Sequence, residues 1–95
     1  PVEMKDKSVL RIRDKAVQIL NDLDPSSSLH DFRVVHGEHQ INLIFDLVVP
    51  IDYDDEKKDA LTLRLTERLK GADPRYECVI TVESDYVAQD SPVEK

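Results

Sequence analysis

The segment from Gln40 to Val49, QINLIFDLVV, decides the fold of this 95-residue chain because two kinds of side chain alternate along it. The odd-numbered positions are all large and apolar: Ile41, Leu43, Phe45, Leu47 and Val49. The even-numbered positions are mixed: Asn42, Ile44, Asp46 and Val48. A period of two residues is typical of a β-strand with one fully buried face and one partly exposed face.

Two further strands are expected on either side of this segment. Leu29 to Val35 precedes it, and the short turn from His36 to His39 joins the two as an antiparallel hairpin. Tyr76 to Glu83 alternates in the same way and forms the third strand. Cys78 lies on the side of that strand expected to face the helices, where a free cysteine acts as a small hydrophobic residue.

Two helices complete the pattern. Apolar residues at steps of three and four predict a helix from Ser8 to Leu23, which ends before Pro25. A second helix begins at Asp54 or Asp55, where a carboxylate caps its first turn. Because this helix connects the second and third strands, those strands must be parallel, with a right-handed crossover. The sequence therefore predicts an α+β fold, a ferredoxin-like α-β-β-α-β arrangement with a three-stranded mixed sheet and two helices on one face.

Composition limits the class of protein. The chain carries 13 Lys and Arg against 20 Asp and Glu, a net charge of −7, which opposes binding to nucleic acids and to anionic lipid surfaces. Its two glycines form no phosphate-binding loop, and no serine or cysteine stands in a nucleophile motif, so we do not expect an enzyme. The longest nearly apolar run, residues 41–51, is far shorter than the ~20 residues that cross a bilayer.

The second face of the predicted sheet has no helix to cover it. Simple alternation places four apolar side chains on that face: Phe32, Val34, Ile44 and Val48. An uncovered apolar strip of this kind is typical of an association surface, so we expect a homodimer.

Polar side chains with metal-binding potential meet at one end of the same face. A hairpin centred on Glu38 places His30 opposite Asp46, with Cβ atoms ~5 Å apart. The parallel third strand brings Thr81 and Glu83 to the same end. One imidazole and two carboxylates, His30, Asp46 and Glu83, suit a divalent cation such as Zn²⁺. In the alternative interpretation, these are ordinary solvated residues on an exposed face; we expect His36 and His39, in the turn, to be solvated.

Three stretches resemble a known family. His30 to Val35 (HDFRVV), Asn42 to Pro50 (NLIFDLVVP) and Tyr76 to Glu83 (YECVITVE) are similar to the cytoplasmic C-terminal domain of cation diffusion facilitator transporters. The resemblance covers roughly residues 8 to 86. It implies a membrane transporter that exports Zn²⁺ or related divalent metals in exchange for protons, with C-terminal domains that form homodimers and bind regulatory metal at and near the dimer interface.

The resemblance also implies roles for single residues. His30 matches the family's first-strand histidine ligand, Asp46 lies where many members carry a second-strand histidine, and Glu83 matches a third-strand carboxylate. Thr81 replaces a histidine of the zinc-binding members. Such an oxygen-rich set accepts Mn²⁺ or Fe²⁺ more readily in relative terms, although zinc keeps the higher raw affinity.

These implications divide the chain into three parts. Residues 1–7 are expected to lead in from a preceding membrane segment, residues 8–87 to form the dimerisation domain, and residues 88–95 to be a disordered tail. The domain would lie on the cytoplasmic side of the cell membrane, attached to the membrane domain of the same transporter and soluble when isolated, and would sense Zn²⁺ or another divalent transition metal. Two alternatives stay open: a metal-independent dimer clamp, and a regulatory module that binds a small molecule.

Overall fold

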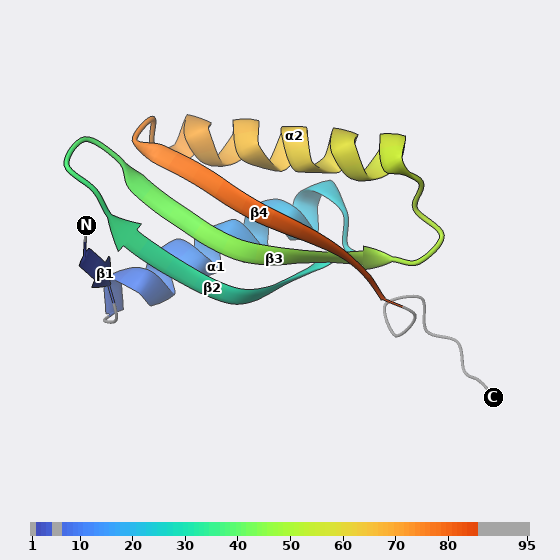
Figure 1. The fold of residues 1–95 in the computed structure, drawn as a ribbon, viewed down its shortest axis with the longest axis horizontal. Coiled ribbons are helices and arrows are strands. Elements are labelled where there is room, and N and C mark those ends of the chain that lie inside the picture. The colour runs from blue at the N-terminus through green and yellow to red at the C-terminus, as the bar shows by residue number, and fades with distance from the viewer. Residues whose placement is uncertain (1, 5–6, 86–95) are drawn as a thin grey trace.

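The computed structural model describes residues 2–4 and 7–85, and the expected tail at residues 88–95 lies outside this part of the chain. Six elements follow one another: β1 (Val2–Met4), α1 (Lys7–Leu23), β2 (Ser28–His36), β3 (Ile41–Pro50), α2 (Asp55–Ala72) and β4 (Tyr76–Asp85). Figure 1 shows α1 passing behind the strands and α2 running alongside β4. From α1 onward, the predicted α-β-β-α-β order and the two-helix layer are confirmed.

The strands form one mixed sheet in the order β1-β2-β3-β4. β2 and β3 pair as the predicted antiparallel hairpin, and β3 pairs with β4 in parallel through α2. The sequence did not indicate β1, which lies within the residues expected to be a lead-in. It adds a fourth strand, antiparallel to β2, with Val2 opposite His36 and Met4 opposite Val34. Three residues are too few to show a period, so this strand is visible only in the structure.

The helices bury one face each against the sheet. α2 starts where expected, because the side chain of Asp54 accepts a hydrogen bond of 2.8 Å from the backbone N–H of Lys57. Its buried residues, Leu61, Leu65 and Leu69, repeat every four residues and so form a single stripe. Those of α1 are Ala16, Ile19 and Leu20. No helix in the described residues is long and apolar enough to cross a membrane.

The core lies between the two helices and the sheet, and the odd-numbered side chains of β3 form its centre. Phe45 has only 1% of its surface exposed, and Leu43, Leu47 and Val49 have none. Cys78 of β4 packs against the same core, and burial raises the pKa of its thiol, as expected of a cysteine that serves as a small hydrophobic residue. The even-numbered side chains of β3 point to the opposite side, which we call the open face of the sheet.

A β-bulge in β2 divides the hairpin into two registers. Before the bulge, His30 lies opposite Asp46 as predicted; after it, Arg33 lies opposite Ile44. Asp31 and Phe32 therefore both stand against Phe45. Asp31 has a φ of 55°, in the left-handed region that aspartate tolerates better than most residues. One extra residue in a strand exchanges the faces of all the side chains that follow it.

Because of this bulge, the apolar strip on the open face consists of other residues than the sequence predicted. Val34 is wholly buried opposite Leu43, and the ring of Phe32 stacks on Phe45 with centroids 5.5 Å apart, so both belong to the core side. The prediction that they lie on the open face was wrong, because the bulge reverses the alternation after His30. The register instead gives the open face these apolar side chains: Val35, Ile44, Val48 and Val79.

Candidate metal centre on the open face

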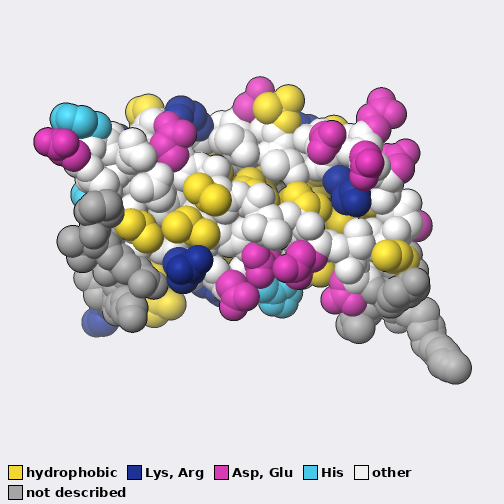
Figure 2. Space-filling view, viewed as in Figure 1, with side chains coloured by type: hydrophobic (Ala, Val, Ile, Leu, Met, Phe, Trp, Pro, Cys, Tyr) yellow, Lys and Arg dark blue, Asp and Glu magenta, His cyan; other side chains and the backbone are white. Residues whose placement is uncertain are grey.

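Two rows of residues cross the open face near the end where β3 and β4 finish. One row is His30, Asp46 and Thr81, and the next is Ser28, Val48 and Glu83. Each row takes one residue from β2, one from β3 and one from β4. Figure 2 shows hydrophobic side chains along the middle of the viewed side, and a histidine beside carboxylates at its lower edge.

His30 and Asp46 are neighbouring candidate ligands on this face. They are direct partners in the antiparallel ladder, as the sequence predicted, so their Cβ atoms are about 5 Å apart on one face. His30 is exposed and Asp46 is half-buried. The bulge at Asp31 begins immediately after His30 and leaves this pair in the regular part of the hairpin. One imidazole and one carboxylate thus project from neighbouring strands on a face that solvent reaches.

Glu83 lies farther from His30 than the sequence analysis implied. It is opposite Val48 and not opposite Asp46. Two strand spacings and two residues of rise separate it from His30, about 10 Å across the strands and about 7 Å along them. No group of three or more His, Cys, Asp and Glu side chains within residues 2–4 and 7–85 is arranged to hold a metal ion. One chain therefore brings together His30 and Asp46 only, and the three-ligand assignment stays a prediction.

The other carboxylates and histidines near the sheet are placed differently. Glu77, on the open face at the far end of β4, is paired with Lys70 at 2.6 Å. Asp46 and Glu83 make no such ion pair in the described part of the chain. His36 and His39, at the hairpin tip, are both exposed, and the segment between them is not helical. The carboxylates available to a cation are thus those at the His30 end of the face.

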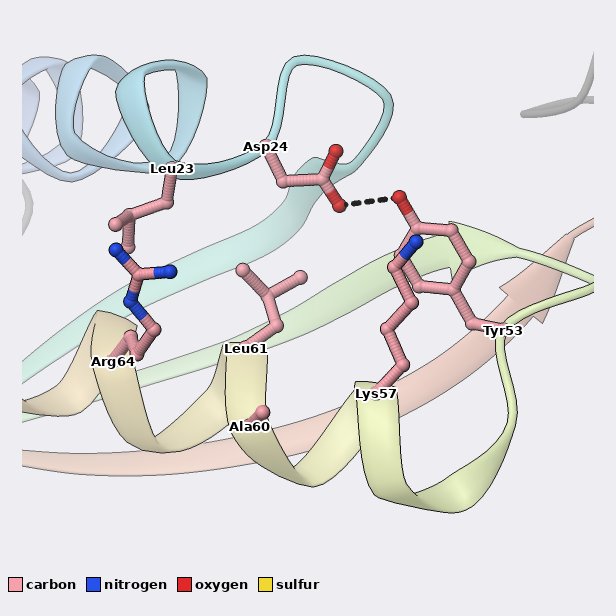
Figure 3. A pocket seen from close by; sticks show the side chains of 7 residues that line it. All are labelled: Leu23, Asp24, Tyr53, Lys57, Ala60, Leu61 and Arg64. Carbon is pink, nitrogen blue, oxygen red and sulfur yellow. Dashed lines mark hydrogen bonds between the residues drawn. The ribbon is translucent and has the colours of Figure 1, made fainter.

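A second location with titratable groups lies on the helix side. A pocket of about 260 Å³ is lined by Leu23, Asp24, Tyr53, Lys57, Ala60, Leu61 and Arg64 (Figure 3). The carboxylate of Asp24 accepts hydrogen bonds from the hydroxyls of Tyr53 at 2.7 Å and Ser27 at 2.8 Å. The ammonium of Lys57 lies 4.2 Å from the centre of the Tyr53 ring.

The polar groups of Asp24, Ser27, Tyr53 and Lys57 in and beside this pocket interact with one another. Burial raises the pKa of Asp24, but its hydrogen bonds outweigh burial and hold the pKa below the ordinary value. Burial and the bond to Asp24 raise the pKa of Tyr53 to about 12. The network joins the end of α1 to the start of α2, and we interpret it as a structural joint. No pattern in the sequence indicates this network, because Asp24 and Tyr53 are 29 residues apart.

Solved structures of known proteins share this fold. No protein-family model matches the chain, and no curated protein matches it significantly. Among solved structures, CzrB is 27% identical, with a TM-score of 0.74 over 86% of this chain and 98% of that chain. CzrB in its zinc form is 26% identical, with the same TM-score over 86% and 90% of the two chains. The chain has the fold of a cation diffusion facilitator C-terminal domain.

A more distant structure agrees on the fold of this family. The metal-bound C-terminal domain of the CzcD transporter from Thermotoga maritima has a TM-score of 0.66 at 15% identity, over 88% of this chain and 95% of that chain. The resemblance to the cation diffusion facilitators stated from the sequence is thus confirmed. In this chain, the open face of that fold carries the His30–Asp46 pair.

Proposed function

We propose that this chain is the cytoplasmic regulatory domain of a divalent-metal efflux transporter, and that it senses Zn²⁺ or a related cation. The observation that carries the proposal is the His30–Asp46 pair on the open face of a cation diffusion facilitator fold. CzrB, whose suggested role is zinc transport, has been solved in a zinc form, and the CzcD domain in a metal-bound form. The role proposed is binding and not catalysis.

The proposed assembly is a homodimer through the open face, formed by residues 8–87. Val79 has 53% of its surface exposed beside the half-buried Ile44, so the face keeps apolar area that the two helices do not cover. Apolar burial contributes about 25 cal/mol per Å², so a few hundred Å² stabilise a small domain appreciably. A second copy also brings a second set of His30, Asp46 and Glu83, which supplies the ligands that one chain does not gather.

The metal is proposed to be held mainly by His30 and Asp46, with Glu83 of either copy completing the coordination. Zn²⁺ takes imidazole nitrogen and carboxylate oxygen at about 2.0–2.2 Å, so both donors suit it. Only neutral imidazole binds a metal, so affinity falls as pH drops through the range in which histidines take up a proton. The cation would be a regulatory ligand from the cytosol, bound at a site separate from the transport site of the membrane domain.

A thermal melt with Zn²⁺ and with chelator tests the proposal. A ligand that binds only the folded state at a hundredfold excess over Kd adds about 2.7 kcal/mol, a shift of roughly 10 °C or more for a domain of this size. We expect His30→Ala to lose most of the shift, while His39→Ala, the matched control in the hairpin turn, keeps it. No shift with any divalent metal, together with a dimer in sedimentation, would favour the metal-independent clamp.

A further inference from the structure

The imidazole of His30 already has a hydrogen-bond partner on the open face. Nε2 of His30 lies 3.0 Å from Oγ of Ser28, two residues earlier in β2. Both side chains precede the bulge at Asp31, so they point to the same side of the strand. Ser28 stands opposite the apolar Val48, and its side chain makes no other hydrogen bond that the described residues reveal.

Which group donates decides whether a metal can bind. A neutral imidazole has one N–H and one nitrogen lone pair. If the hydroxyl of Ser28 donates to Nε2, the lone pair is occupied and the proton sits on Nδ1, so neither nitrogen is open to a cation. If Nε2–H donates to Ser28, the lone pair of Nδ1 faces away from this bond and is open.

We propose that Ser28 is a positioning residue that accepts the hydrogen bond from Nε2–H of His30 and so makes Nδ1 the metal-binding nitrogen. The inference rests on the proposed function and deepens it, because it assigns the atom through which the site would take Zn²⁺. Metal-binding histidines usually donate the second ring N–H to an oxygen acceptor, which fixes the tautomer and the ring orientation. Here the acceptor is Ser28, at the start of the same strand and two residues before His30.

The first experiment needs no metal. Long-range ¹H–¹⁵N spectra of the histidine rings, recorded at about pH 8 where imidazoles are neutral, distinguish the Nε2–H and Nδ1–H tautomers. We expect His30, assigned by comparison with His30→Gln, to be mainly the Nε2–H tautomer, and Ser28→Ala to reduce that preference. A dominant Nδ1–H tautomer in the wild type would overturn the proposal.

The second experiment measures Zn²⁺ affinity by calorimetric titration. We expect Ser28→Ala to weaken binding by about 10- to 100-fold, the range found when the outer partner of a metal-binding histidine is removed. Ser28→Thr keeps the hydroxyl and should restore the affinity, while Ser84→Ala, at an exposed serine of β4, should leave it unchanged. Equal affinities of the wild type and Ser28→Ala would overturn the inference alone. A wild type that binds no zinc would overturn the proposed function.

Discussion

Replacing Tyr53 by phenylalanine tests the joint between the two helices. The carboxylate of Asp24 accepts three hydrogen bonds, from Tyr53 at 2.7 Å, from Ser27 at 2.8 Å and from the backbone N–H of Ser26 at 3.0 Å. Tyr53→Phe removes only the one that links the end of α1 to the start of α2. A hydrogen bond to a charged group contributes about 1.5–3 kcal/mol, and two donors remain, so we expect a loss of about 1–2 kcal/mol.

Thermal and urea unfolding measure this loss. For a domain of this size, 1 kcal/mol corresponds to about 4–8 °C in the melting temperature. Tyr76→Phe is the matched control, because Tyr76 is also half-buried, yet its hydroxyl has no hydrogen-bond partner among residues 2–4 and 7–85. If Tyr53→Phe melts together with the wild type and with Tyr76→Phe, the joint does not stabilise the fold and the reasoning is refuted.

The stabilisation by the Asp24–Tyr53 hydrogen bond should also depend on pH. The pKa of Asp24 is lowered on folding, so its contribution is present above its ordinary value of 3.8 and is lost as pH falls further. The pKa of Tyr53 is raised from 10.0 to about 12, so its contribution is present below pH 10 and is lost as pH rises toward 12. The stability difference between the wild type and Tyr53→Phe should therefore be greatest between these limits and narrow on both sides.

Three further predictions concern the bulge, the open face and the cap of α2. Asp31→Gly should keep the bulge because glycine adopts a positive φ readily, whereas Asp31→Val should lose about 1–3 kcal/mol in urea unfolding; equal losses would refute the strained conformation. Ile44→Asp should weaken the dimer in sedimentation equilibrium while the fold persists, whereas Ile41→Asp, 6% exposed in the core, should unfold the domain; a variant at Ile44 that dimerises like the wild type would exclude this face. Asp54→Ala should lower stability by about 1 kcal/mol through loss of the α2 cap, and an unchanged melt would contradict that role.

Local patterns predicted most of the fold, and the reasons for the failures are physical. The alternation in β3 and the four-residue stripe of α2 survive in the structure because each is repeated several times. The bulge left no such signal, since an aspartate stands at the left-handed position that a glycine would have marked. A single extra residue then moved Val34 from the open face to the core.

The candidate site was likewise predicted only in part. The hairpin register places His30 beside Asp46 as the sequence predicted, because this pair precedes the bulge. The position of Glu83 depends on the register between β3 and β4. This register places Glu83 opposite Val48, one row away from His30 and Asp46. The hydrogen bond between Ser28 and the His30 ring depends on side-chain orientation, and no spacing in the sequence encodes that.

We propose that the open face binds a divalent metal at its His30 end. The most direct measurement is a ¹H–¹⁵N spectrum of the labelled domain during titration with Zn²⁺, read as a map of the backbone amides that shift. We predict changes centred on His30 and Asp46 that extend to Ser28 and Glu83 and are reversed by chelator. Changes confined to the hairpin tip, at His36 to His39, would contradict a metal site at His30.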